Sequence, residues 1–244
     1  MTAELQENRI LGAVRFIDAV TALPIDAPLA VRAAGVRWIR NRRSYWVIAE
    51  APAFDAYESS FTAPPAAPAV GSVTLPFQVS DPGGRWLPRL GSIALPRDPD
   101  PANGTKPQSL FAVTDVPLYP APAAPIERGW AIVYGSVAAT TPGTTLAGAL
   151  VRVVRDSDGV RIGAGLSDAR GEVLIAVEGI PSTSLGVGDG PVVTTDVVVQ
   201  LQVVWDPAAG PVPDPDALEA RRVALLVRQT TARLAAGQVL TMAL

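Results

Sequence analysis

Several stretches of the chain alternate apolar and polar residues with a period of two, the pattern of a strand that buries one face. In residues 73–79 the apolar positions are Val73, Leu75, Phe77 and Val79. One face of residues 197–205 carries Val197, Val199, Leu201, Val203 and Trp205, and one face of residues 173–177 carries Val173, Ile175 and Val177. These stretches predict half-buried strands. Pro76 has no N–H to donate and therefore predicts an edge or a bulge for the first of them.

The two halves of the chain repeat the same order of features. Residues 14–31 and 133–153 each read as a strand, a turn of small residues with Thr and Pro, and a second strand. Each half then reaches a polar turn and a third strand that ends near Pro52 or Pro181. The proline-rich residues 118–130 separate the halves, whereas the proline-rich residues 62–71 read as a stiff loop. We expect one domain over residues 1–120 and a related one over residues 121–244.

The second half carries a recognisable series of motifs, "LAGALV" at residues 146–151 and "SDARG" at residues 167–171. Gly171 can adopt the positive φ of a tight turn, and the Asp168 carboxylate can accept hydrogen bonds from amides two residues on. These motifs resemble the carboxypeptidase-regulatory-like, or transthyretin-like, immunoglobulin-type sandwich. The resemblance implies a fold and no activity. In the first half Ser44 stands where the turn glycine would be.

The sequence changes character from Asp214 onward. "DPDALEARRVALL" offers Asp214 or Asp216 as a helix N-cap, Pro215 in the first turn and two arginines near the end. Two short strands are expected around Gly237. The expected fold is mainly β, with two tandem Ig-like or transthyretin-like β-sandwich domains and a short C-terminal helix.

Composition narrows the chemistry. A net charge of −3 gives no general attraction for nucleic acid or anionic membranes, and neither is expected as a partner. The chain has no Cys and no His, so thiolate chemistry and the commonest general base are excluded. The only lysine, Lys106, has no S-x-x-K arrangement around it. We expect no enzyme activity, no catalytic residues, no cofactor and no metal site.

Three polar motifs have simpler explanations. "DSDG" from Asp156 resembles a calcium loop, but Ser167 stands where the twelfth position needs Glu, so a hairpin turn at Asp158 and Gly159 is expected. The sequon that starts at Asn103 is expected to be a turn. The carboxylates at Asp81, Asp98 and Asp100 are expected to be solvated loop residues.

One local patch could bind a partner. Residues 31–46 interleave basic and aromatic side chains, and the candidate residues are Arg37, Trp38, Arg40, Arg42, Arg43, Tyr45 and Trp46. Such residue types anchor protein interfaces. The alternative is a solvated hairpin whose arginine stems cover apolar surface.

The function expected from these features is structural. The segments "RFIDAVTALPIDAPL", "NRRSYWVI" and "DPGGRWLPR" are similar to proteins encoded beside phage-tail-like contractile injection particles. The resemblance implies an adaptor, baseplate or decoration protein whose partners are other subunits or copies of itself. The first ten residues lack a secretion signal, so we expect cytoplasmic synthesis and release by lysis. A carbohydrate- or receptor-binding module that uses some of the five tryptophans is the alternative.

Overall fold

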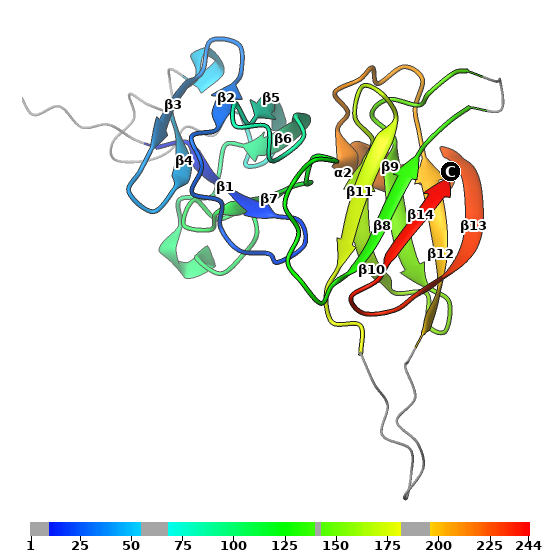
Figure 1. Ribbon diagram of the computed structural model, residues 1–244. Helices are drawn as coiled ribbons and strands as arrows, with labels where there is room; N and C mark the ends of the chain where they lie inside the picture. Colours follow the sequence, from blue (N-terminus) through cyan, green and yellow to red (C-terminus); the bar gives the residue numbers. More distant parts are fainter. Residues whose placement is uncertain (1–9, 55–67, 140–142, 182–195) are drawn as a thin grey trace, which may run out of the picture. The chain divides into compact units, whose positions relative to one another are not determined.

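A computed structural model describes residues 10–54, 68–139, 143–181 and 196–244 of the protein. In these residues the fold is mainly β, with four sheets and one short α-helix near the C-terminus (Figure 1). This confirms the expected β class and the C-terminal helix. No helix within the described ranges has the length and apolar character needed to span a membrane.

The chain divides into two compact units. The first comprises Met1–Ile17, Leu23–Val79 and Leu90–Pro117. The second comprises Asp18–Ala22, Ser80–Arg89 and Leu118–Leu244. Two short segments from the N-terminal half therefore group with the second unit.

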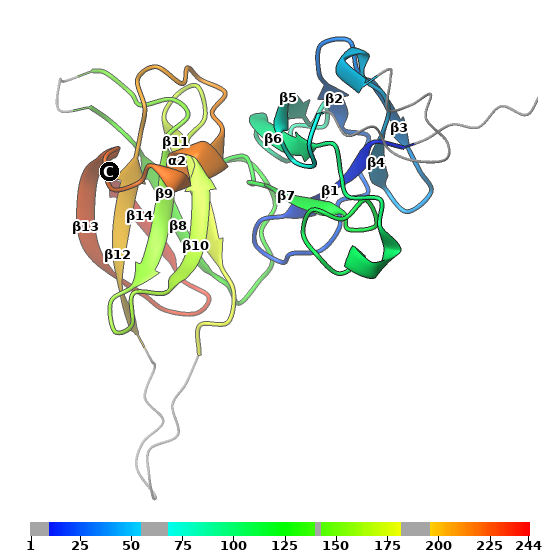
Figure 2. The same cartoon turned by 180° about the vertical axis from the view of Figure 1, so that it is seen from behind.

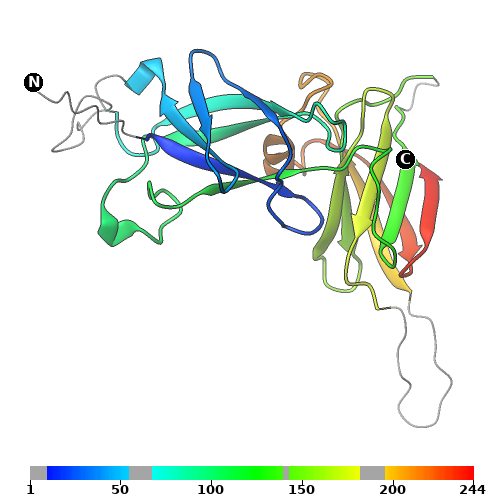
Figure 3. The ribbon, with the colours of Figure 1, turned by 60° about the vertical axis from the view of Figure 1, so that its left-hand side comes forward.

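The strands of the first half form two sheets. They are β1 (Gly12–Asp18), β2 (Ala30–Arg32), β3 (Arg37–Arg40), β4 (Tyr45–Glu50), β5 (Val73–Ser80), β6 (Arg89–Leu95) and β7 (Thr114–Leu118). One sheet has the order β3-β4-β1-β7 and the other β2-β5-β6. Figure 3 shows β7 (green) running beside β1 (dark blue). Two 3₁₀ turns, Pro52–Phe54 and Pro101–Asn103, lie in the connections.

Phenylalanine side chains join the two sheets of the first unit. Phe16 of β1 and Phe77 of β5 are both buried and meet edge to face with their ring centroids 6.3 Å apart. Phe77 and Val79 are buried while Thr74, Pro76 and Gln78 are exposed, as the alternation predicts. β5 lies between β2 and β6, and the edge or bulge expected at Pro76 stays a prediction. Since β2 has only three residues against eight in β5, most of β5 pairs on one side alone.

The second unit contains two further sheets and the helix. Its strands are β8 (Ala131–Ser136), β9 (Leu150–Arg155), β10 (Arg161–Leu166), β11 (Glu172–Val177), β12 (Val197–Val204), β13 (Leu226–Leu234) and β14 (Val239–Ala243), and its helix is α2 (Pro215–Ala220). The sheet orders are β10-β9-β12-β13 and β11-β8-β14. Figure 1 shows this unit from the three-stranded sheet and Figure 2 from the four-stranded sheet. β14 pairs with β8 in parallel. The pairs β9–β10, β8–β11, β12–β13 and β9–β12 are antiparallel.

Both sheets of the second unit contribute to one hydrophobic core. Val133 and Ile175 from the three-stranded sheet and Val153 and Leu201 from the four-stranded sheet are completely buried in it. The predicted inward positions of β12 are confirmed, because Val199, Leu201 and Val203 all lie in this cluster. The half-buried strand expected over residues 173–177 is wrong, because Leu174 and Ala176 on the other face of β11 are buried as well.

Glycines bring β10 close to β11 at one side of this core. A Cβ atom on Gly165 would lie 2.8 Å from Ile175 Cγ1 and 2.8 Å from the Leu174 carbonyl oxygen. A Cβ atom on Gly163 would lie 2.9 Å from Val177 Cγ2. Only glycine fits such an approach without displacing a neighbour.

The turns of the second unit follow the sequence closely. Gly171 has a φ of +79°, and Asp168 Oδ1 accepts hydrogen bonds from the amides of Arg170 at 2.8 Å and Glu172 at 2.9 Å. Asp214 is the N-cap of α2 and accepts from the amides of Asp216 at 3.0 Å and Ala217 at 3.3 Å. The two terminal strands are present, but they pair with β12 and β8 rather than with each other.

Candidate partner-binding sites

The β3–β4 hairpin holds all seven residues of the predicted patch. Trp38 lies opposite Ile48 and Arg40 opposite Trp46 in the antiparallel register. Asn41 Oδ1 closes the turn by accepting hydrogen bonds from the amides of Arg43 and Tyr45, both at 2.9 Å.

The turn also has a residue in the left-handed region. Ser44 has a φ of +60°, which is uncommon for a residue other than glycine. Its hydroxyl donates to Asp26 Oδ1 at 2.6 Å. The serine therefore performs the conformational role of the turn glycine and adds a hydrogen bond.

The aromatic side chains of the hairpin pack within the first unit. Trp38 meets Phe77 edge to face at 5.8 Å between ring centroids, and Trp46 meets Phe16 in the same way at 6.4 Å. Tyr45 is half-buried and lies beneath the Arg15 guanidinium at 5.9 Å. The two indoles pack against buried phenylalanines and Tyr45 is covered by Arg15, so the three rings do not form an open platform for a ligand.

Two of the four arginines are neutralised by acids of the same unit. Arg37 forms an ion pair with Glu50 at 2.5 Å, and the hydrogen bond from Arg37 lowers the pKa of the Glu50 carboxyl. Arg40 forms an ion pair with Asp26 at 2.6 Å and also donates to the Ser44 hydroxyl at 3.0 Å. Both arginines therefore stabilise the hairpin.

Arg42 and Arg43 remain at the tip of the hairpin. Both side chains are exposed, and neither forms an ion pair with any residue of the described ranges. The structure thus separates the seven predicted residues into three packed rings, two paired arginines and two arginines open to an acidic partner. This pair is called the hairpin tip below.

A second candidate surface lies along β13. Within the described residues β13 is the last strand of its sheet, so one of its sides has no neighbouring strand. Apolar side chains are exposed where it begins, with exposed fractions of 86% for Val223, 42% for Leu226 and 50% for Val227. These three residues together with β13 are called the β13 edge below. Unpaired edges of this length are templates for pairing with another chain.

The polar motifs of the sequence form turns. Asp158 accepts from Arg155 Nη2 at 2.7 Å and from the Val160 amide at 3.1 Å, which confirms the hairpin turn and lowers the pKa of this carboxyl. Asn103 of the sequon donates to Asp98 Oδ2 at 2.7 Å within a turn. Asp81 accepts from the amides of Gly83 and Arg85, both at 2.8 Å.

Sequence reasoning missed a buried arginine in the second unit. Arg89 has no exposed surface, forms an ion pair with Asp216 and lies 3.6 Å from Asp214 Oδ1. Glu219 of the same helix pairs with Arg152 Nε of β9 at 2.8 Å. The spacing of Asp216 and Glu219 was the available signal, because residues three apart share one helix face. These contacts fasten α2 to its unit.

Comparisons with known proteins identify no family. No family model matches the chain, and no curated protein matches it in sequence. Among solved structures it is similar to the Bacillus anthracis TIE protein, at 8% identity and a TM-score of 0.28. The match covers 96% of this chain and 33% of that one, so the chain spans about a third of its length. A likeness of this degree carries no argument about fold or function.

Proposed function

We propose that the protein is a non-enzymatic structural or assembly component that binds other protein subunits. The β13 edge is the observation that supports this most directly. An extended segment can add to an unpaired strand through main-chain hydrogen bonds, and exposed apolar side chains beside the strand add contact area. Val223, Leu226 and Val227 supply such side chains within five residues.

In this proposal the second unit is a carboxypeptidase-regulatory-like, or transthyretin-like, β-sandwich. Its shared core between two sheets and its Asp168–Gly171 turn are consistent with the sequence motifs that suggest this family. The first unit is a related sandwich of the Ig-like class. Modules of this kind hold surfaces in place and perform no chemistry.

In this proposal the protein is part of a phage-tail-like contractile injection particle. The support is the sequence resemblance of the first half. The protein serves there as an adaptor, baseplate or decoration subunit, is made in the cytoplasm and leaves by lysis. The hairpin tip gives it a second contact, since Arg42 and Arg43 suit an acidic subunit surface.

The positions of the tryptophans favour assembly over carbohydrate binding. A sugar-stacking platform needs exposed indole faces, and none of the five tryptophans is exposed. Trp86 is buried, and Trp205 Nε1 donates to the Ala147 carbonyl oxygen at 3.1 Å.

The test is co-sedimentation with released particles. Tagged protein is expressed in its native host, and particles from the lysate are separated on a density gradient. We expect the tagged protein in the particle fractions, and we expect the double variant Val223→Asp, Leu226→Asp to leave them. Val160→Asp is the matched control, because Val160 is exposed to 48% but lies in the β9–β10 turn.

Two results would overturn the proposal. One is wild-type protein that stays at the top of the gradient and sediments as a monomer at high concentration. The other is a double variant that retains its native circular dichroism spectrum and still enters the particles as well as Val160→Asp does.

A further inference from the structure

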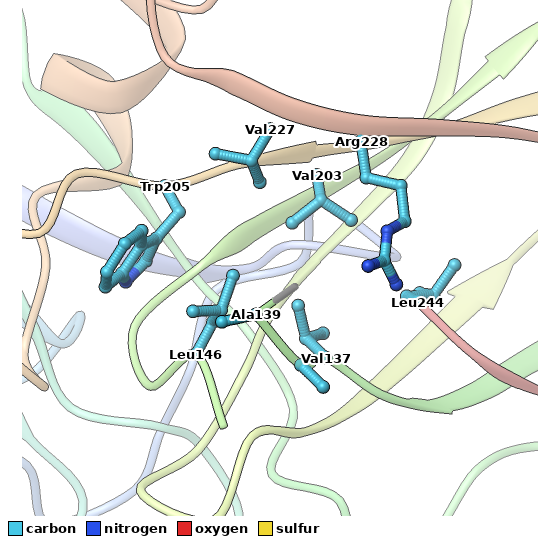
Figure 4. Close-up of a pocket in the computed structure, with 9 residues that line it drawn as sticks. Val137, Ala139, Leu146, Val203, Trp205, Val227, Arg228 and Leu244 are labelled. Carbon is cyan, nitrogen blue, oxygen red and sulfur yellow. The ribbon is translucent and has the colours of Figure 1, made fainter. Parts of the chain in front are cut away.

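The second unit contains a pocket on the side away from the β10–β11 contact. A four-stranded sheet there shares its core with a three-stranded one, so the inward side of β13 is left partly uncovered. The pocket has a volume of about 130 Å³. Its walls are mainly apolar, and the residues that line it include Val137, Leu146, Val203, Trp205, Leu244 and Arg228. Figure 4 shows these side chains around the pocket.

Arg228 is the charged member of this lining. It lies opposite Val203 in the β12–β13 register, and Figure 4 shows its side chain extending toward Leu244. Arg228 is half-buried and forms no hydrogen bond or ion pair with any residue in the described part of the chain. The Leu244 carbonyl oxygen is instead bound by the Ala138 amide at 2.8 Å.

Arg152, a largely buried arginine on the same sheet, has the kind of partner that Arg228 lacks. Arg152 of β9 is paired with Glu219 at 2.8 Å. A guanidinium has five N–H donors and no acceptor, so partial burial without a partner is unfavourable. A carboxylate can accept two of these bonds side by side and neutralise the charge.

We propose that this pocket, the Arg228 pocket, binds a small amphipathic carboxylate. The apolar walls take a ring or short chain, and Arg228 takes the carboxylate. A cavity of roughly 150 Å³ lined by aliphatic and aromatic side chains holds one benzene molecule, so the Arg228 pocket suits about six apolar heavy atoms. A single guanidinium balances a single negative charge, which favours a carboxylate over a doubly charged phosphate monoester.

Two kinds of ligand carry such a carboxylate beside an apolar group. The carboxylate can belong to a free small acid or to the C-terminal residue of a peptide with an apolar side chain. The inference goes beyond the assembly role, because the pocket lies within one unit and requires no particle. Its failure would therefore leave the co-sedimentation result unaffected.

The experiment is an NMR titration of the full chain with matched probes. Phenylacetate and phenylacetamide have the same shape but differ in charge, and N-acetyl-glycyl-phenylalanine and its C-terminal amide form the peptide pair. We expect phenylacetate or the peptide acid to shift the amide signals of Val137 and Val203. We expect its neutral partner to bind at least about tenfold more weakly, as loss of a hydrogen-bonded charge implies.

Two substitutions test the arginine itself. Arg228→Gln should weaken binding of the acid about tenfold and remove the preference over the amide. Arg233→Gln is the matched control, because Arg233 lies on the same strand but is exposed on its other face, and it should bind as the wild type does. Val227→Phe gives an independent check, since Val227 is half exposed at the pocket and a larger ring there should block the probe.

Binding of phenylacetate without the peptide acid assigns the site to free small acids, and tighter binding of the peptide acid assigns it to chain ends. Either result supports the proposal. Three results would overturn it: equal binding of acid and amide, equal binding of the acid by Arg228→Gln and wild type, or no shift with either acid at about 50 mM. An acid-selective interaction that is detected only above about 50 mM would be adventitious.

Discussion

Gly171 and Gly159 provide a matched pair for separating backbone strain from steric overlap. Both are left-handed, with φ values of +79° and +70°. A Cβ atom on Gly171 would lie 2.7 Å from the Val137 carbonyl oxygen and 2.9 Å from Thr145 Cβ, whereas a Cβ atom on Gly159 would have nothing within 4 Å. Gly159→Ala therefore adds strain alone, and Gly171→Ala adds strain and overlap.

The expected magnitudes follow from these distances. An alanine held in the left-handed region costs about 1 kcal/mol in each variant. The overlap at Gly171 also displaces a backbone oxygen, and the nearby hydrogen bond from the Val137 amide to Gly171, 2.7 Å long, resists the movement. Overpacking of this kind costs about 2 kcal/mol more. The expected loss in the free energy of unfolding is thus about 1 kcal/mol for Gly159→Ala and about 3 kcal/mol for Gly171→Ala.

Urea denaturation followed by circular dichroism measures the difference. With a slope of about 2 kcal/mol per molar urea, the midpoint of Gly171→Ala should lie about 1 M below that of Gly159→Ala. Unchanged slopes would show that both variants report on the folded state. Equal midpoints for the two variants would refute the reasoning, because the overlap would then contribute nothing.

Three further predictions concern both units. Asp214→Ala should lower the free energy of unfolding, measured by urea denaturation, by at least about 1 kcal/mol, whereas Asp214→Asn keeps the N-cap and should lower it less. Equal losses in the two variants would contradict a capping role. Trp38 Nε1 is buried without a hydrogen-bond partner in the described part of the chain, so Trp38→Phe should change stability by less than about 1 kcal/mol and Trp38→Ala by more than about 2. Burial raises the pKa of Tyr119 above its usual 10.0. The folded chain therefore keeps a proton that the unfolded chain loses, so stability should fall as the pH rises above about 10, and less steeply in Tyr119→Phe.

Local features of the fold were predictable because neighbouring residues determine them. The alternation in β5 and β12, the Asp168–Gly171 turn and the N-cap at Asp214 depend on residues a few positions apart. Strand order is not determined by neighbouring residues, because the period of a strand identifies its buried face and not the strands beside it. β5 illustrates this point, since its alternation identifies its buried face but does not show that β2 and β6 are its neighbours.

The candidate sites were predictable only in part. The sequence places Arg37, Arg40 and Arg42 among aromatic residues, but the acids that pair with the first two, Glu50 and Asp26, lie ten or more residues away. Trp38 and Arg40 share one face of β3, so alternation alone does not separate the rings from the charges. The Arg228 pocket depends on unequal numbers of strands in two sheets, which no local pattern of residues records.

Because β10 and β11 approach closely, the two borders of the second unit tolerate larger side chains to different degrees. At Gly163 and Gly165 even one added methyl group meets an atom of β11, so this border fixes the spacing of the layers. Around Val227 on the opposite border, side-chain volume can increase without displacing a strand. Homologues should therefore conserve small residues at the first border and diversify at the second, where a new binding preference can evolve without loss of the fold.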